Sequence, residues 1–228
     1  MIATIVNTGA VLVGGSIGFL LKRFITKEIS KPIFQALGLC IILIGIKGAL
    51  EIDTILVVIA SMVIGVILGE WIDLDKRLNQ FGAFLQKKTN LKNETSIATG
   101  FVSASLLFCV GAMSIIGPLQ SGLTGNHEIL FTKSALDFVS SVIFAATLGV
   151  GVLLSSGFVL IYQGAITLFA GVIEPFLTTA MITDISCVGS LLIIAIGLNL
   201  LDITKIKIAN LLPAVFLPVL LHFVIGLF

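Results

Sequence analysis

The stretch GPLQSGLTGNHEILFTKSALD, residues Gly117–Asp137, interrupts a chain that is otherwise almost continuously apolar. It follows the apolar run Ile97–Ile116 and precedes the run Phe138–Leu154, so it separates two membrane-length segments near the middle of the chain. One proline and two glycines in it disfavour a regular helix; they are Pro118, Gly122 and Gly125. The stretch therefore predicts a polar, turn-rich connection between apolar helices.

The charges of this stretch allow two interpretations. Lys133 and Asp137 are four residues apart, so on a helix they lie one turn apart and can neutralise each other. Ionisable groups near lipid are costly unless they are paired or hydrated. The pair is either part of a substrate or ion site, or an intramembrane salt bridge behind an external loop that only fixes helix packing.

The composition defines the class of protein. Of the 228 residues, 57% are hydrophobic and 11% are charged, whereas a soluble domain carries about 25% charged residues. We therefore predict an all-α integral membrane protein, with residues 1–228 forming a single polytopic membrane domain. The net charge of +1 gives no indication of nucleic-acid binding. Because no basic residue precedes Met1–Leu21 and two follow it, this segment is expected to stay as the first span.

Eight apolar segments are long enough, at about 20 residues each, to cross a bilayer. They are approximately Ile2–Leu21, Pro32–Leu50, Thr54–Trp71, Ile97–Ile116, Phe131–Leu154, Gly157–Ile173, Ile185–Leu201 and Ile206–Phe228. Basic residues gather in the first, third and seventh loops, and acids in the second, fourth and sixth. Since cytoplasmic loops attract Lys and Arg, the odd loops are predicted inside and both termini outside.

The third loop is the only long one. Within it, Glu70–Lys88 places apolar residues on one helical stripe and charges on the other side. This pattern predicts an amphipathic helix, at about residues 70–88, lying in the inner membrane interface.

An internal repeat links the two ends of the chain. LCIILIG at Leu39–Gly45 matches LLIIAIG at Leu191–Gly197 at a constant offset. The matching segments lie in the second and seventh spans, an odd number of crossings apart, so the two copies are expected to cross the membrane in opposite directions. We therefore predict a 3+2+3 arrangement with inverted repeats: repeat one at about 1–75, a central pair at about 97–154 and repeat two at about 157–228. Such symmetry is typical of transporters and occurs in some channels.

Glycines recur at the spacing that lets helices approach closely. The pairs are Gly14 with Gly18 and Gly65 with Gly69. Helix packing, or homo-oligomerisation through these glycine faces, is one interpretation. The other is a bare backbone that lines a pore.

Several polar side chains lie within or near the apolar runs, including Asn7, Gln163, Asn199 and His222. Intramembrane amides join helices or bind a solute. Asn199 matches Lys47 in the repeat, so it is included among the candidates for a substrate or ion site. The full candidate set is Gln120, Asn126, Lys133, Asp137 and Asn199.

Enzyme chemistry has little support in the sequence. The three cysteines form no CxxC pair or Cys/His cluster, and His127 and His222 are far apart. We expect no catalytic residue, no metal site and no cofactor.

Two segments, Cys109–Asp137 and Asn7–Gly18, resemble the bacterial multi-pass membrane family called domain of unknown function 554. The resemblance covers the whole chain and implies a protein of the bacterial inner membrane, often described as a transport protein. Ser121 and Asn126 stand where the family pattern leads us to expect acids. If those acids bind a cation in relatives, this chain binds it less tightly or differently.

Two functions of different classes follow. The first is a small secondary transporter or channel for an ion or metabolite, set in the lipid bilayer. The second is a scaffold, sensor or accessory subunit that transports nothing. The sequence names no solute.

Overall fold

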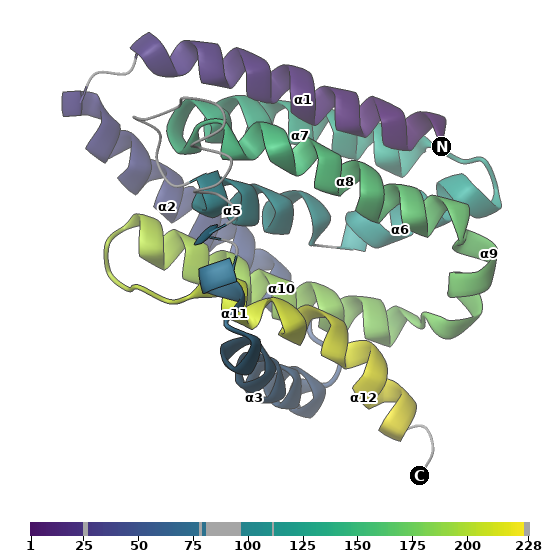
Figure 1. The fold of residues 1–228 in the computed structure, drawn as a ribbon. Coiled ribbons are helices and arrows are strands. Elements are labelled where there is room, and N and C mark those ends of the chain that lie inside the picture. Colours follow the sequence, from purple (N-terminus) through teal and green to yellow (C-terminus); the bar gives the residue numbers. More distant parts are fainter. Residues whose placement is uncertain (25–26, 78, 81–96, 111, 226–228) are drawn as a thin grey trace. The chain divides into compact units, whose positions relative to one another are not determined.

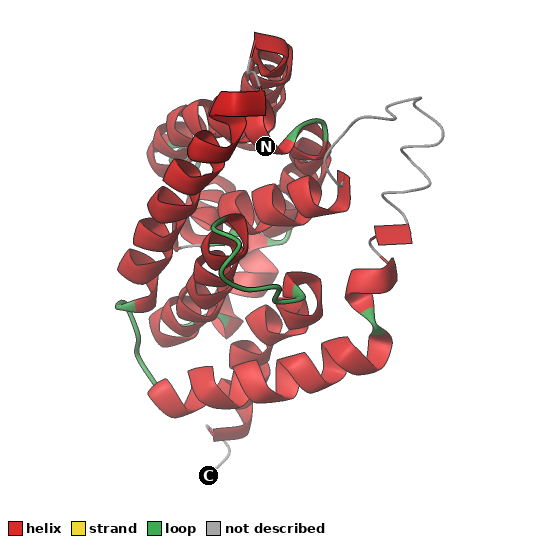
Figure 2. Cartoon of the chain, turned by 90° about the vertical axis from the view of Figure 1, so that its left-hand side faces the viewer, coloured by secondary structure: helices red, strands yellow, loops and turns green. Residues whose placement is uncertain are grey.

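The computed structural model describes residues 1–24, 27–77, 79–80, 97–110 and 112–225, and within these residues every regular element is a helix (Figures 1 and 2). Among the described residues, six helices are long and apolar enough to cross a membrane, and a bent pair of shorter helices would make a seventh. The predicted all-helical membrane class is confirmed, whereas the predicted count of eight spans is not. The described residues group into two compact units, which are taken in turn.

The first unit comprises Met1–Ile33, Asn79–Cys109 and Met113–Phe176. Its helices α1 (Ile2–Leu21), α7 (Glu128–Leu148) and α8 (Gly151–Leu168) pack side by side (Figure 1). The remaining elements are α5 (Ile97–Cys109), α6 (Ala112–Leu123) and the short helices η1 (Lys22–Phe24), α9 (Ala170–Ile173) and η2 (Glu174–Phe176).

Close packing of α1 on α7 depends on two glycines. A Cβ on Gly14 would meet Ser141 and the carbonyl of Phe138, and one on Gly18 would meet the carbonyl of Val142. Against α8, the helix α1 runs antiparallel: Thr4 hydrogen-bonds Thr167, while Gly15, further along α1, approaches Leu153 near the start of α8.

The predicted continuous fourth span, Ile97–Ile116, is wrong. Helix α5 ends at Cys109, and Met113–Leu123 of α6 continues at an angle of 58° to it. Pro118 and Gly122 lie inside α6 and not in a loop. Gly122 is needed there because a Cβ would collide with the carbonyl of Thr167.

The predicted boundary between the fifth and sixth spans also lies elsewhere. Helix α7 begins at Glu128 and ends at Leu148, where Gly149 takes a φ of 80°, and α8 starts at Gly151. The expected turn between Leu154 and Gly157 therefore lies within α8. A single glycine with positive φ, which other residues rarely adopt, ends the helix without any polar residue to signal the turn.

The second unit comprises Phe34–Leu78, Val110–Ala112 and Leu177–Phe228. Its elements are α2 (Lys27–Ala49), α3 (Ile55–Ile72), α10 (Thr179–Leu200), α11 (Ile208–Leu211), η3 (Leu212–Phe216) and α12 (Leu217–Ile225). Of the six candidate membrane spans, α10 is the most buried, since 78% of its most apolar stretch lies inside the protein. The side-chain oxygen of Thr178 accepts a hydrogen bond from the backbone N–H of Met181, which explains why α10 starts well before the predicted Ile185.

Helices α2 and α10 cross in antiparallel directions at small residues. Gly38 approaches Gly197 and Leu201, whereas Gly45, two turns later on α2, approaches Ser190 and Ile194 on the earlier part of α10. At these points the backbones touch, which is the usual use of small residues between membrane helices.

Helix α3 packs antiparallel on the broken segment that ends the chain. Gly65 contacts Ala214, and Gly69 contacts the backbone of Asn210. The predicted eighth span, Ile206–Phe228, is not one helix, because it divides into α11, η3 and α12. Pro213 lies at the start of η3 and Pro218 at the start of α12, so each proline's missing N–H falls where a helix begins.

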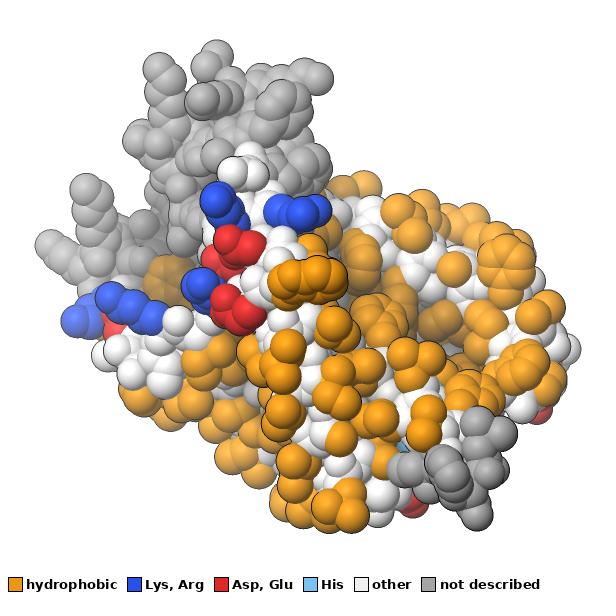
Figure 3. All heavy atoms as spheres, turned by 60° about the horizontal axis from the view of Figure 1, so that its bottom comes forward, with side chains coloured by type: hydrophobic (Ala, Val, Ile, Leu, Met, Phe, Trp, Pro, Cys, Tyr) orange, Lys and Arg blue, Asp and Glu red, His pale blue; other side chains and the backbone are white. Residues whose placement is uncertain are grey.

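The predicted amphipathic helix at 70–88 starts inside α3, which continues to Ile72 and ends at Asp73 with a φ of 51°. Most of its remaining length, residues 78 and 81–88, lies outside the described residues. Helix α3 carries exposed apolar side chains along its length: Ile55, Leu56, Ile59, Val63, Ile67 and Trp71. Figure 3 shows hydrophobic side chains over this face of the molecule and charged side chains gathered at one end of it.

Candidate functional site

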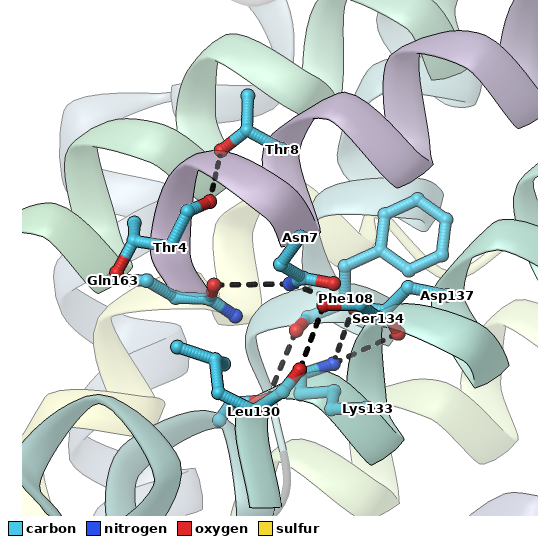
Figure 4. Close-up of polar contacts among 10 residues, drawn as sticks. Thr4, Asn7, Thr8, Phe108, Leu130, Lys133, Ser134, Asp137 and Gln163 are labelled. Carbon is cyan, nitrogen blue, oxygen red and sulfur yellow. Dashed lines mark hydrogen bonds and ion pairs between the residues drawn. The ribbon is translucent and has the colours of Figure 1, made fainter. Parts of the chain in front are cut away.

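The first unit contains a buried ion pair on α7. The side chains of Lys133 and Asp137 project from successive turns, and the two residues are only 5% and 6% exposed. The ammonium nitrogen of Lys133 lies 2.8 Å from one carboxylate oxygen of Asp137 and 2.7 Å from the other (Figure 4). The pairing expected from the four-residue spacing is therefore present.

Two amides from other helices complete this arrangement. The Nδ2 of Asn7, on α1, donates to Oδ2 of Asp137 at 3.1 Å and to Oε1 of Gln163, on α8, at 3.0 Å (Figure 4). Both amides are fully buried. We call these four residues, Asn7, Lys133, Asp137 and Gln163, the polar centre. It joins α1, α7 and α8 through side chains that would be costly in lipid if left unpaired.

Two atoms of the polar centre have no hydrogen-bond partner among the residues that the structure describes. They are the Oδ1 of Asn7 and the Nε2 of Gln163, an acceptor and a donor. Buried polar atoms are nearly always hydrogen-bonded in folded proteins, and each one left unpaired costs about 1–3 kcal/mol. In the polar centre, one acceptor and one donor on two hydrogen-bonded amides are therefore available to bind water or a solute.

The bend between α5 and α6 lies beside the polar centre. The hydroxyl of Ser114, near the start of α6, donates to the carbonyl of Phe108 near the end of α5 at 2.9 Å. The thiol of Cys109, the last residue of α5, is close enough to interact electrostatically with both charges of the ion pair. Broken membrane helices expose backbone groups that bind solutes in many transporters.

The other predicted site residues have local roles. Gln120 lies half-buried on α6, and its backbone carbonyl accepts two hydrogen bonds from Thr124. Asn126 is exposed, and its side-chain oxygen accepts a hydrogen bond from the N–H of Glu128, where α7 begins. In the second unit, the amide of Asn199 bonds Thr204 and both the N–H and the carbonyl of Ile206, so it shapes the loop after α10.

The second unit has a buried acid that the sequence placed in a loop. Asp184 lies on α10 with no exposure. Its Oδ1 accepts hydrogen bonds from the backbone N–H groups of Asp53 and Thr54, at 3.1 and 3.0 Å, and its Oδ2 lies 2.9 Å from Nε2 of His222. This carboxylate therefore ties the start of α3 and the helix α12 to α10.

The predicted helix-packing glycines all contact helices of their own chain. Gly14 and Gly18 face α7, while Gly65 and Gly69 face η3 and α11. Within the described residues, no group of three or more His, Cys, Asp or Glu side chains is placed to hold a metal ion.

Sequence reasoning missed the partners of the ion pair. Asn7 and Gln163 were visible as polar residues inside apolar runs, but nothing in the sequence connects positions 7, 137 and 163. The only available signal was that each is an amide or acid within a span, where polar side chains tend to find one another.

These features define a multi-pass helical membrane protein with a buried, charge-balanced polar centre. The chain belongs to the family described as protein of unknown function DUF554, whose model matches residues 2–223. It is 35% identical over 232 residues to the uncharacterized membrane protein YdfK of Bacillus subtilis, covering all of this chain and 98% of that one. It is 32% identical over 222 residues to the uncharacterized protein YqgA of Escherichia coli, covering 95% and 94% of the two chains. No solved structure matches.

Proposed function

We propose that this protein is a small secondary transporter or channel of the bacterial inner membrane that moves a small ion or metabolite. The observation that carries the proposal is the polar centre. A salt bridge that only joined turns of one helix would need no amides from two further helices. The polar centre also keeps one buried acceptor and one buried donor without a partner among the described residues, and these atoms can bind a solute.

Matching helix boundaries support the predicted internal repeat. The repeat pairs each residue of the first copy with a residue of the second at a constant distance along the sequence, as Gly45 is paired with Gly197. It takes η1 (Lys22–Phe24) onto η2 (Glu174–Phe176). It also takes residues 27–49 of α2 onto 179–201, where α10 lies, and residues 55–72 of α3 onto 207–224, which α11, η3 and α12 cover. Shared boundaries over three successive elements are a stronger signal than a short run of Ile and Leu identities.

The direction of the helices supports inversion of this repeat. Helix α2 crosses its equivalent α10 in antiparallel fashion, and α3 and α1 do the same with α11–α12 and α8. The α2–α10 crossing is also symmetric: Gly45 meets Ser190 and Ile194, whereas Gly197 meets Gly38 and Ile42, which are the equivalents of those two residues. Inverted repeats of this kind are characteristic of transporters that alternate access to one site.

Asp137→Asn is the direct test of transport. The change keeps the size of the side chain and removes its charge, so Lys133 would be left without a counter-charge. We expect flux of the transported ion or metabolite into reconstituted vesicles to be lost, while membrane insertion stays intact. The matched control is Asp202→Asn, at an exposed loop position, which should transport at the parental rate. Unchanged flux in Asp137→Asn would refute the role given to the polar centre.

A scaffold, sensor or accessory subunit is the alternative function. The two are separated by the thermal unfolding of the purified protein in the presence of a panel of ions and small metabolites. A transporter is stabilised by the solute that it binds, and a scaffold should respond to none of them.

A further inference from the structure

Resting on the proposed function, we propose that the polar centre binds a small anion together with one proton, the anion at Lys133 and the proton at Asp137. In the step proposed, Asp137 takes a proton from water and loses its ionic bond to Lys133. The ammonium of Lys133 then pairs with the anion. Release of both restores the original ion pair, so the centre holds zero net charge throughout.

Charge balance leaves few alternatives. The centre as observed contains one cation and one anion, both almost fully buried. An extra net charge in such surroundings is strongly disfavoured. A neutral loaded state therefore requires either an anion with a proton on Asp137, or a cation with a proton removed from Lys133.

The hydrogen-bonding groups favour the anion. The carboxylate of Asp137 already receives hydrogen bonds from Lys133 and Asn7 on the oxygens that a cation would need. Metal cations also require several oxygen ligands, and no cluster of three acidic or other metal-binding side chains occurs in the described residues. By contrast, the ammonium of Lys133, once freed from its carboxylate, is a charged hydrogen-bond donor of the kind that binds anions.

The two unpaired amide atoms are the ones that a protonated Asp137 would use. A rotation of each side-chain amide by about 180° exchanges the positions of its oxygen and nitrogen. The Oδ1 of Asn7 can then accept hydrogen bonds from the new O–H of Asp137 and from the Nε2 of Gln163. In the ionised state the opposite atoms of the same amides are paired. The network can therefore satisfy Asp137 in both protonation states without moving a helix.

The neighbouring titratable groups do not compete for this proton at neutral pH. Around the polar centre they are Lys133 itself on α7, Cys109 on α5 and, beyond the thiol, Tyr162 on α8. Helix α1 contributes the uncharged Asn7. A thiol and a phenol lose protons only above neutral pH in ordinary surroundings, so Asp137 is the group available to accept one.

Proton uptake during binding tests this inference. The purified full-length protein in weakly buffered detergent would be mixed with the sodium salts of chloride, nitrate, phosphate and lactate, and separately with potassium and magnesium gluconate. We expect at least one of the four small anions to bind with uptake of about one proton per anion. Because a proton must bind with it, its affinity should fall about tenfold for each pH unit of increase.

Two variants separate the roles of the two charges. Lys133→Gln should weaken anion binding about 10- to 100-fold, since a charged hydrogen bond is lost. Asp137→Asn imitates the protonated carboxyl, so it should still bind the anion but without proton uptake and without the pH dependence. Elution as a single symmetric peak in size-exclusion chromatography shows that each variant is folded.

Three outcomes would overturn the inference: proton release on adding a cation, anion binding that leaves the proton count unchanged, or no binding by any of these salts. Reconstituted vesicles can still show a flux of ion or metabolite that is lost in Asp137→Asn. In that case only the proposal of coupled anion and proton binding is refuted, and the proposed transport function stands. If that flux is also absent, both fail.

Discussion

At the scale of single residues, the buried ion pair matters for stability chiefly through the free energy that is lost when one partner is removed. A buried pair adds little stability compared with a well-packed apolar pair, whereas removing one partner leaves an isolated charge. Both side chains are nearly inaccessible, and the nearest neutral partners are Asn7 and Gln163. The proposed transport role, in which one charge is exchanged for another, uses this dependence of each charge on a partner.

Lys133→Met is expected to destabilise the protein by about 3–5 kcal/mol, because Asp137 would stay buried with its charge uncompensated. The double variant Lys133→Met with Asp137→Leu removes both charges and should recover most of that loss. Thermal unfolding in detergent measures both. Equal stability of the single variant and the parent would show that the ion pair is better hydrated than its burial indicates.

Asp184 is the second residue whose loss should be costly. In Asp184→Leu, the backbone N–H groups of Asp53 and Thr54 lose their acceptor and His222 loses its partner. We expect a loss of about 2–5 kcal/mol, since buried donors would be left unpaired. Asp53→Asn, at an exposed position, is the control and should change the unfolding midpoint very little.

At the scale of helices, the close crossing of α2 and α10 in the second unit depends on two glycines, which have no side chain. A Cβ on Gly45 would lie 2.6 Å from Cγ1 of Ile194, and one on Gly197 would lie 2.5 Å from Cγ1 of Ile42. Both would also press on backbone atoms, which cannot move aside as a side chain can. The two glycines are therefore equivalent in their surroundings as well as in the repeat.

Gly45→Ala and Gly197→Ala should each destabilise the protein by a similar amount, about 1–3 kcal/mol, through overpacking at the crossing. Gly157→Ala is the matched control: it is also helical, but a Cβ there meets nothing within 4 Å. That change should be neutral or stabilising by up to about 1 kcal/mol, because alanine favours the helix. Clearly unequal effects at Gly45 and Gly197 would argue against the symmetric crossing.

The sequence predicted local features of the fold well. The Lys133–Asp137 contact follows from helical spacing within one element, and most apolar segments became helices. The bend after Cys109 was missed because the chain there, Cys109–Ala112, is apolar and contains no proline. The true start of α10 was missed because Asp184 looks like a loop residue until its hydrogen-bond partners are known.

The polar centre could be predicted only in part, for a similar reason. Asn7 reaches both Asp137 and Gln163 because α1, α7 and α8 pack together, and this packing depends on contacts between distant parts of the chain. Asn199 was expected at the site on the strength of its place in the repeat. Its hydrogen bonds to Thr204 and Ile206 instead serve the loop that follows its own helix.

At the scale of the whole molecule, the proposed repeats are shared between the two units. The first unit contains α1 and its proposed equivalent α8, and the second contains α2 and α3 with their proposed equivalents α10 and α11–α12. Each unit therefore holds one part of each copy.

The proposed transport function depends most on the two copies of the repeat crossing the membrane in opposite directions. Labelling of single cysteines tests this orientation directly. Arg23→Cys follows α1 and Glu174→Cys follows α9, at nearly equivalent places in the two copies, and both positions are exposed. Each would be made in a background without Cys40, Cys109 and Cys187. The outer membrane of the cells is removed and the inner membrane is left intact, and a membrane-impermeant thiol reagent is added. The reagent should label the Glu174→Cys variant at once, and the Arg23→Cys variant only after the inner membrane is permeabilised. Labelling of both from the same side would contradict the inverted repeat and the transport function built on it.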